Sequence, residues 1–460
     1  MTTDFRVGVR AYAGEVPDAP VAPVQSSPIG IAGTSKATAA AFNLNPTIDG
    51  DTITYEDLPV VGDVVRIDDR DDTQQFGTVR NPFSDVGVNQ AAAYAGWSLP
   101  DGTLPYTMQG VLANGVDQMV AVRYDTHNTN ATRIANAIDA LDALANDNGT
   151  GVTPEFFMCP MDGMNYSETA TRTTPLSTAS TVVSKLDEVA EDAGGLAIVA
   201  LPWRKSGQSM ADYETFCGDY ADNNRNSNVI FVGPMAVPTF NVPTTRTTTS
   251  EYPTGMPDGK SGGKAIDPVG MVAGAFARRT FTVGEHANPN LMEINGIAEL
   301  APVLGFKLQY TGNDFSAMMH QKAVNTIIRH NGFHFWGAFV SALSGGAAER
   351  YINARRVLLD IVRHLEVSNQ VAIQENITSG YFDFVVAQNS EYLNGLVNPD
   401  QPGGPKALTA DIRPHPTKNT DATLNNAQAF WVIEYTSVVP GLYSEYEVVA
   451  LNPVLSQIAG

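Results

Sequence analysis

Apolar segments of strand length alternate with helical segments between residues 116 and 237. The expected strands are 118–124, 156–159, 196–201 and 229–232, and the expected helices between them are 131–145, 181–193 and 210–222. Strands that alternate with helices pair in parallel, and the crossover between two such strands is right-handed. The alternation therefore predicts a small parallel sheet covered by helices, which is an α/β unit.

The remainder of the chain is long enough for further domains. A chain of 460 residues favours two or three domains rather than one core. Residues 47–77 are acidic and strand-like and predict a small β insertion. Two long loops are expected, at 244–264 and at 398–426, because both segments are rich in glycine and proline and have no periodicity.

Both ends of the chain contain a strand-like segment with no partner beside it in the sequence. The apolar residues of these segments are Phe5, Val7 and Val9 near the start and Tyr446, Val448, Val449 and Leu451 near the end. A strand must pair its backbone N–H and C=O groups, so each segment is expected to join a sheet elsewhere. Three prolines, at positions 17, 20 and 23, predict an extended strap after the first segment.

The charge and composition exclude some classes of partner. The formal net charge is −21, whereas a nucleic-acid-binding protein normally carries an excess of Lys and Arg, so no direct contact with nucleic acid is expected. No signal peptide and no run of about 18 apolar residues is present, which predicts synthesis in the cytoplasm without membrane insertion. Cys159 and Cys217 are the two cysteines; we expect free buried thiols, with a disulfide bridge as the alternative.

Two short motifs resemble binding sites but lack essential parts. Gly259-Lys260-Ser261 resembles the end of a phosphate-binding loop, yet Thr254 occupies the position of its first glycine, and no strand or helix flanks it. His330 and His334 have the spacing of a zinc-binding helix, but their segment predicts a turn that enters a strand. We therefore predict no catalytic, cofactor-binding or metal site.

Residues 349–366 predict an amphipathic helix with several arginines. One face carries Glu349, Asn353, Arg356, Asp360 and Arg363, and the opposite face carries Tyr351, Ala354, Leu358, Ile361, Val362 and Leu365. Arg355 lies among the apolar residues and needs a carboxylate partner or a path to the edge of the core. Arg356 and Arg363 have two interpretations: an ordinary solvated face, or cations that contact an acidic partner.

Five segments together resemble a known family. They are 23–35, 267–278, 295–297, 333–337 and 351–356. An aromatic strand that ends in Trp336-Gly337, followed by a helix that begins Tyr-Ile-Asn-Ala-Arg-Arg, is similar to the core of contractile-tail sheath proteins. These subunits stack around the tube of bacteriophage tails and related injection machines. Many relatives continue with Arg and Thr after the Trp-Gly pair, where this chain has Ala338-Phe339, so local contacts are expected to differ.

The resemblance implies a multidomain protein of α+β and α/β class. The family's core α+β domain is completed by terminal arm strands, with an outer α/β domain and β excursions inserted into it. The implied boundaries are an N-terminal arm at 1–20, an outer and middle domain at 21–308 with the α/β unit 116–237, an inner core domain at 309–443 and a C-terminal arm at 444–460.

The resemblance also implies a mechanical function without cofactors. Such subunits form hexameric rings stacked around a tail tube protein and contract to drive the tube through a cell envelope. Baseplate and tail terminator proteins are implied as further partners, and the implied location is the virion tail, assembled in the host cytoplasm. The arm strands would join neighbouring subunits, Arg356 and Arg363 would be candidate contacts to the tube, and Trp336, Tyr351 and Arg355 would pack in the core.

Two other classes of function remain as alternatives. A tail terminator or capsid protein would also assemble without chemistry, but it would not form cylinders of contractile length. A nucleotide-binding α/β enzyme is the second alternative, and saturable nucleotide binding would distinguish it.

Overall fold

The computed structural model describes most of the chain from residue 28 to residue 440. The described residues are 28–34, 47–49, 52–54, 64–67, 104–116, 118–124, 130–145, 153–160, 177–204, 208–239, 265–305, 315–342, 346–368, 377–426 and 428–440. Both predicted arm strands, with Phe5, Val7, Val9, Tyr446, Val448, Val449 and Leu451, lie outside this part of the chain, as do the predicted loop 244–264 and its Gly-Lys-Ser motif.

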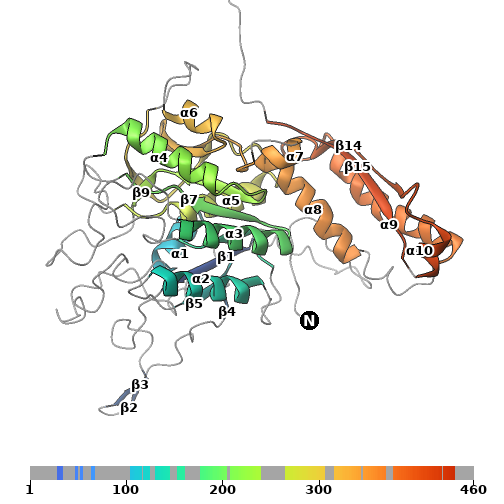
Figure 1. Ribbon diagram of the computed structural model, residues 1–460, viewed down its shortest axis with the longest axis horizontal. Helices are drawn as coiled ribbons and strands as arrows, with labels where there is room; N and C mark the ends of the chain where they lie inside the picture. Colours follow the sequence, from blue (N-terminus) through green and yellow to red (C-terminus); the bar gives the residue numbers. More distant parts are fainter. Residues whose placement is uncertain are drawn as a thin grey trace, which may run out of the picture.

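A nine-stranded mixed sheet forms the centre of the molecule (Figure 1). Its strands lie in the order β10-β13-β12-β8-β7-β6-β1-β5-β4. The parallel strands are β1 (Ile29–Thr34), β5 (Met119–Tyr124), β6 (Phe156–Met158), β7 (Leu196–Ala200), β8 (Val229–Gly233) and β12 (Asn325–Arg329). Antiparallel strands close both edges: β4 (Val64–Ile67) on one side and β13 (Phe333–Trp336) with β10 (Met292–Glu293) on the other.

Helices cover both faces of this sheet. On one face lie α2 (Asn130–Ala145), α3 (Ser177–Asp192), α4 (Met210–Asn223) and α6 (Phe315–Gln321), and on the other lie α1 (Leu104–Leu112) and α5 (Val269–Thr282). Neighbouring residues of one strand point to opposite faces, so Phe156 packs with α5 while Phe157 packs with α2 and α3. The result is a three-layer α/β arrangement with a core on each side of the sheet.

The predicted α/β alternation is confirmed, but the sheet is larger than the sequence indicated. All four predicted strands and all three predicted helices are present, with ends that differ by a few residues. The strand β1, from far earlier in the chain, inserts between β5 and β6. The strands β12 and β13, which follow the predicted domain boundary at 308/309, extend the sheet beyond β8, and the domain boundaries stay a prediction.

Two further pairs of strands lie outside the large sheet. The strands β2 (Thr47–Asp49) and β3 (Thr52–Thr54) form a hairpin, which together with β4 accounts for the predicted β insertion. The strands β9 (Met235–Pro238) and β11 (Ile297–Ala301) pair in antiparallel fashion.

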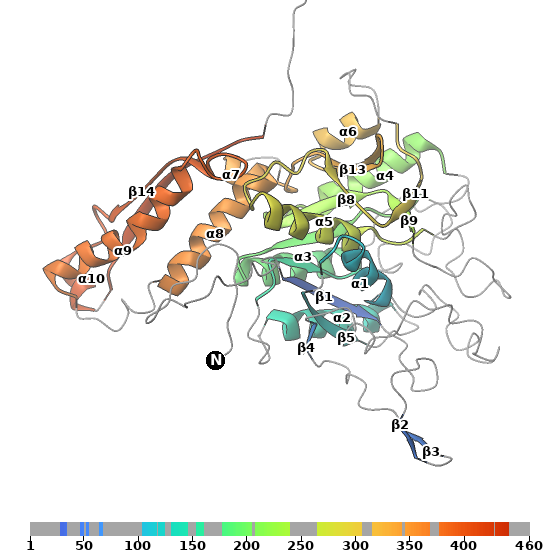
Figure 2. The same ribbon diagram turned by 180° about the vertical axis from the view of Figure 1, so that it is seen from behind.

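The last part of the described chain packs against α8 (Ile352–Ser368) in a core of its own. After the short helix α7 (Ala347–Arg350), α8 leads to α9 (Ser379–Val397), the strands β14 (Ala407–Pro414) and β15 (Trp431–Ser437), and α10 (Asp421–Asn425) between them. We call α9, α10, β14 and β15 the C-terminal unit. Figures 1 and 2 show this unit at one end of the molecule, beside α8 and away from the large sheet. The long loop predicted at 398–426 is therefore wrong, since it contains β14 and α10.

The helices α1 and α5 approach each other unusually closely. Glycines occupy the contact at positions 110, 270 and 274. A Cβ atom on Gly270 would lie 2.2 Å from the carbonyl oxygen of Thr107, and one on Gly274 would lie 2.8 Å from that of Val111. The two backbones are thus in direct contact, which only glycine permits. This contact lies within the segment 267–278 that carried part of the family resemblance.

Candidate functional site

The helix α8 lies at the amino ends of three neighbouring parallel strands. Glu155 directly precedes β6, Gly194 stands two residues before β7, and Asn228 directly precedes β8. One arginine of α8 binds each of these three residues. In open α/β sheets small ligands bind beyond the carboxyl ends of the strands. Here the helix α8 lies at the opposite end, at the amino ends of the strands. Its three arginines connect it to the sheet of the same chain.

Arg356 forms a buried ion pair with Glu155. Its Nε and Nη2 atoms donate to Glu155 Oε1 at 2.9 and 2.6 Å, and Nη2 also donates to Thr280 Oγ1. The two side chains are only 2% and 5% exposed. The guanidinium also lies over the Phe156 ring, 5.1 Å from its centroid. The charge of Arg356 is thus neutralised inside the chain, between α8, α5 and the start of β6.

Arg363 binds backbone rather than a carboxylate. Its Nε and Nη2 atoms donate to the carbonyl oxygen of Gly194, with an Nε distance of 2.8 Å. Gly194 has φ +62°, and a Cβ atom there would lie 3.2 Å from Arg363 Cγ. Glycine at this position therefore serves both the left-handed backbone and the close approach of the arginine.

Arg355 reaches the third strand end. Its Nε and Nη2 atoms donate to Asn228 Oδ1 at 3.1 and 2.6 Å, and the backbone N–H of Asn228 donates to Asp187 Oδ1 at 2.8 Å. The expectation for Arg355 was a carboxylate partner or a path to the edge of the core; the structure gives it an amide partner, and its side chain is half-buried. Trp336 and Tyr351, predicted to pack in the core with it, are both half-buried.

The prediction that Arg356 and Arg363 form a solvated face, or a face that contacts a tube, is wrong. Both side chains are buried within their own chain and hydrogen-bonded there. The physical reason is that α8 is covered on two sides. Ile352 and Leu359 join the core of the large sheet, while Val357 and Ile361 join the core of the C-terminal unit. A helix in this position has little surface left for a solvated stripe.

A second charged cluster connects the C-terminal unit to the end of α5. Lys406, just before β14, forms an ion pair with Glu285, and its Nζ atom lies 3.9 Å from Asp360 Oδ2 on α8. The hydroxyl of Tyr392 on α9 donates to Asp360 Oδ2 at 2.8 Å. Glu285 and Asp360 are both buried, at 3% and 4% exposed. Four segments of the chain therefore meet at one buried group of charges.

The two carboxyls of this cluster differ in their pKa values. Burial favours the neutral form of Glu285, but the Lys406 ammonium overcomes this effect and lowers the pKa of Glu285 to about 2. Burial, and then the negative charge of Glu285, raise the pKa of Asp360 to about 7. Burial also lowers the pKa of His286 and of His364.

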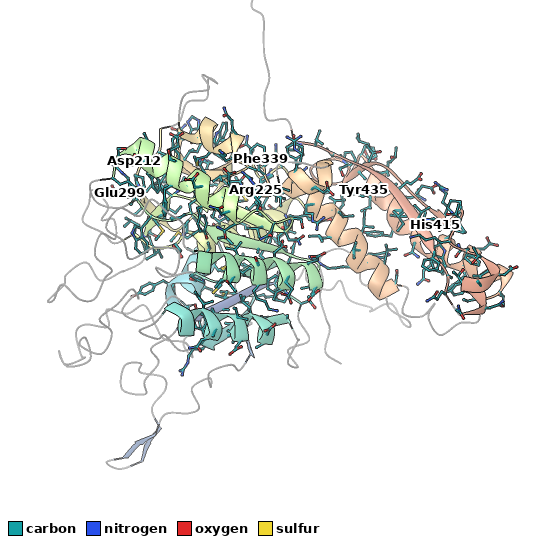
Figure 3. The ribbon with its side chains drawn as sticks, in the orientation of Figure 1. Asp212, Arg225, Glu299, Phe339, His415 and Tyr435 are labelled. Atoms are coloured by element: carbon teal, nitrogen blue, oxygen red, sulfur yellow. The ribbon has the colours of Figure 1, made fainter. Side chains whose placement is uncertain are left out.

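The hairpin of β14 and β15 has two unlike faces. Its inner face packs on α8 and α9 and carries Ala410, Ile412, Trp431, Ile433 and Tyr435. Its outer face is exposed, and there Asp411 stands directly opposite Glu434, which also pairs with Arg413. Within the part of the chain that the structure describes, the two strands pair only with each other. Figure 3 shows Tyr435 and His415 along this unit, with His415 toward α10.

The described residues were expected to hold no metal site, and their His, Cys, Asp and Glu side chains are scattered. No group of three or more His, Cys, Asp or Glu side chains among them could hold a metal ion. His334 lies in β13, and a tight turn at Asn331 and Gly332 separates it from β12, as predicted.

Cys159 and Cys217 are buried free thiols, which confirms the expected state. No helix in the described part of the chain is long and apolar enough to cross a membrane.

Sequence reasoning missed the acidic partners Glu155 and Glu285 and the amine of Lys406. One signal was available for Glu155, since it stands between Pro154 and the apolar run that begins at Phe156. A carboxylate directly before a buried strand is itself removed from water and needs a cation nearby. No such signal exists for Glu285 or Lys406, which are 121 positions apart and stand in irregular segments.

Solved contractile assemblies match this arrangement over almost the whole chain. A chain of the anti-feeding prophage baseplate, 6-fold symmetrised, matches with a TM-score of 0.58, 14% identity and coverage of 96% of this chain and 100% of that chain. A chain of the contracted sheath complex of an extracellular contractile injection system, named PVC, gives a TM-score of 0.55, 13% identity and coverage of 96% and 98%. The contracted helical sheath of the anti-feeding prophage gives 0.54, 14% identity and coverage of 96% and 99%.

This chain has a sheath fold. The resemblance that the sequence indicated is thereby confirmed at the level of the fold, and the sheath fold here includes both the large sheet and the C-terminal unit, because the match covers 96% of the chain. No model of a protein family matches the sequence, and no curated protein matches it. At 13–14% identity the likeness lies in backbone arrangement rather than in shared side chains.

Proposed function

We propose that this chain is the sheath subunit of a contractile injection particle. It polymerises as hexameric rings stacked around an inner tube, and contraction of the stack drives the tube through a target envelope. The observation that carries the proposal is the match over 96% of the chain to two sheath structures in the contracted state. A particle of this kind also contains a baseplate, and one similar chain belongs to a 6-fold symmetrised baseplate. A tail tube protein and a tail terminator complete the proposed set of partners.

The β14–β15 hairpin is the proposed site where subunits join. A two-stranded sheet has an unpaired row of backbone N–H and C=O groups on each outer edge, and such an edge accepts a further strand. The strand-like segments around Phe5–Val9 and Tyr446–Leu451 would supply the missing strands from neighbouring copies. Backbone pairing of this kind holds subunits together while their other contacts change.

The two faces of the hairpin determine which side of the N-terminal strand would face α8 and α9 when it pairs with the hairpin. In an extended strand, Phe5, Val7 and Val9 would point to one side, and Arg6 and Arg10 would point to the other. The apolar side would continue the inner face that rests on α8 and α9. The two arginines would then lie on the outer face, the same face that carries the exposed carboxylates of Asp411 and Glu434. In this arrangement the arm would be complementary to the hairpin on both faces.

Removal of residues 1–15 should abolish polymerisation and leave a folded subunit. The reason is that each subunit loses the strand that it would add to its neighbour. Negative-stain electron microscopy of the purified proteins gives the readout: the full chain should form helical tubes with a wide lumen, and the shortened chain should form none. Long tubes from the shortened chain would rule out the strand exchange, and single rings from the full chain would favour a tail terminator.

Charge exchange tests the partner of the arm. The double substitution Asp411→Lys with Glu434→Lys should weaken assembly by about tenfold in critical concentration, because the arginines of the arm then meet like charge. Adding Arg6→Glu and Arg10→Glu to the same chain should restore assembly. A matched control is Asp383→Lys with Glu391→Lys, which changes two exposed carboxylates on α9 and should leave assembly unchanged. Failure of the restoring pair would mean that the arm adds elsewhere.

A further inference from the structure

Six titratable side chains from four segments converge where the C-terminal unit meets the end of α5. Glu285 and His286 follow α5, Asp360 and His364 belong to α8, Tyr392 belongs to α9, and Lys406 precedes β14. Glu285, His286 and Asp360 are buried. The ring of His364 stacks on that of Tyr392 with a centroid distance of 3.7 Å. This cluster is separate from the Arg356–Glu155 pair and plays no part in the proposed strand exchange.

The cluster contains more acid than its single amine can neutralise. The ammonium of Lys406 is bonded to Glu285, whereas its distance to Asp360 Oδ2 is 3.9 Å. Asp360 keeps one hydrogen bond, from the hydroxyl of Tyr392. Two buried carboxylates that share one close cation cannot both ionise without a large electrostatic cost. The geometry therefore assigns the retained proton to Asp360, in agreement with the direction of its pKa.

We propose that Glu285, Lys406, Asp360 and Tyr392 form a proton-operated latch between the C-terminal unit and the large sheet. With Asp360 protonated the latch is closed, because one ion pair and one neutral acid are buried together. Ionisation of Asp360 places two carboxylates beside one ammonium and loosens the latch. The proton of Asp360 leaves to solvent, and no other group in the cluster takes it.

The other charged groups that face Asp360 do not remove this effect. Arg363 on the same helix favours the ionised form of Asp360, but its guanidinium is engaged with the carbonyl oxygen of Gly194. Arg356 acts on Glu285 from a distance and is neutralised by Glu155. Burial lowers the pKa of His286 and His364 and so favours the neutral form of both rings. Burial and the nearby Asp360 raise the pKa of Tyr392, which stays a neutral donor.

The direction of the pH dependence follows from the folded and unfolded pKa values of Asp360. The folded value is about 7 and the unfolded value is 3.8. Between these values the folded chain binds a proton that the unfolded chain has released, so stability falls as pH rises. Glu285 has the opposite shift, and its contribution is lost only as pH falls from about 4 toward about 2. Of the two carboxyls, Asp360 is the one that titrates near neutral pH.

Hydrogen exchange of the full-length protein, read by mass spectrometry, tests the latch. After correction for the intrinsic rate at each pH, peptides of α9 and β14 should exchange about tenfold faster at about pH 8.5 than at about pH 6. Peptides of α2 and α3, which lie far from the cluster, should show no such difference. The variant Asp360→Asn keeps the acceptor for Tyr392 but cannot ionise, so it should remove the pH difference. The control Asp383→Asn, at an exposed position of α9, should retain it.

An unchanged pH difference in Asp360→Asn would overturn the latch, and so would a wild-type difference spread evenly over all peptides. Infrared difference spectroscopy of the wild-type protein supplies a second test that needs no variant. A protonated carboxyl band should disappear between about pH 6 and about pH 8.5, because ordinary carboxyls are already ionised there. Absence of that band would also overturn the proposal. Neither result depends on whether the chain forms a sheath.

Discussion

Replacing Arg356 with methionine is expected to lower the free energy of unfolding by about 3–5 kcal/mol, because it leaves the carboxylate of Glu155 buried without its cation. The two side chains are 2% and 5% exposed, so water cannot take over the role of the guanidinium. Thr280 also loses a donor. Urea denaturation followed by circular dichroism measures the change.

The double variant Arg356→Met with Glu155→Leu separates the cost of an unpaired charge from the net worth of the pair. Removing both partners should recover most of the lost stability, since buried ion pairs are often replaceable by apolar residues. The matched control is Arg329→Met, at an exposed position at the end of β12, where the change should stay within about 0.5 kcal/mol. If Arg356→Met behaved like this control, the side chain would not be buried against Glu155.

Substitution of Gly270 by alanine is expected to destabilise the chain by about 2–4 kcal/mol. The added methyl group would lie 2.2 Å from the carbonyl oxygen of Thr107, which belongs to the backbone of α1 and cannot turn away. The helices α1 and α5 would have to separate, and the core between α5 and the sheet would lose contacts. Differential scanning calorimetry should show a lower unfolding temperature.

The control for this prediction is the same substitution where the molecule has room. Gly395 lies inside α9, and a Cβ atom there would meet nothing within 4 Å. Alanine is the better helix former, so Gly395→Ala should raise stability by about 0.5–1 kcal/mol. Opposite signs for the two variants would show that the contact between helices, rather than the loss of glycine, determines the outcome. A neutral Gly270→Ala would contradict the close approach.

The α/β layer could be predicted from the sequence because its signals are local. Four apolar runs and three helical segments each carry their own periodicity, and all seven were found at nearly the correct positions. The place of β1 could not be predicted, since insertion of a strand between β5 and β6 depends on contacts across more than 80 positions. The hairpin strand β14 was not predicted, because the glycine- and proline-rich residues around it indicate a loop.

The contacts of the charged residues of α8, in contrast, could not be predicted from the sequence. The sequence shows which residues share a face of the helix, but not how many faces the fold covers. Arg356, Arg363 and Asp360 give the pattern of a solvated stripe, and that pattern is the same whether their partners are water or Glu155, Gly194 and Tyr392. Only the position of α8 between two cores decides the question.

The place of α8 at the amino ends of β6, β7 and β8 determines how the molecule responds to mechanical force. A pull on the C-terminal unit reaches the sheet through Glu155, Gly194 and Asn228, at the tips of three parallel strands. Parallel strands are joined by evenly spaced, slanted hydrogen bonds. Tension on β6, β7 and β8 together would load the bonds to their outer neighbours β1 and β12 in shear, several at once, instead of opening them one after another as in peeling from an edge.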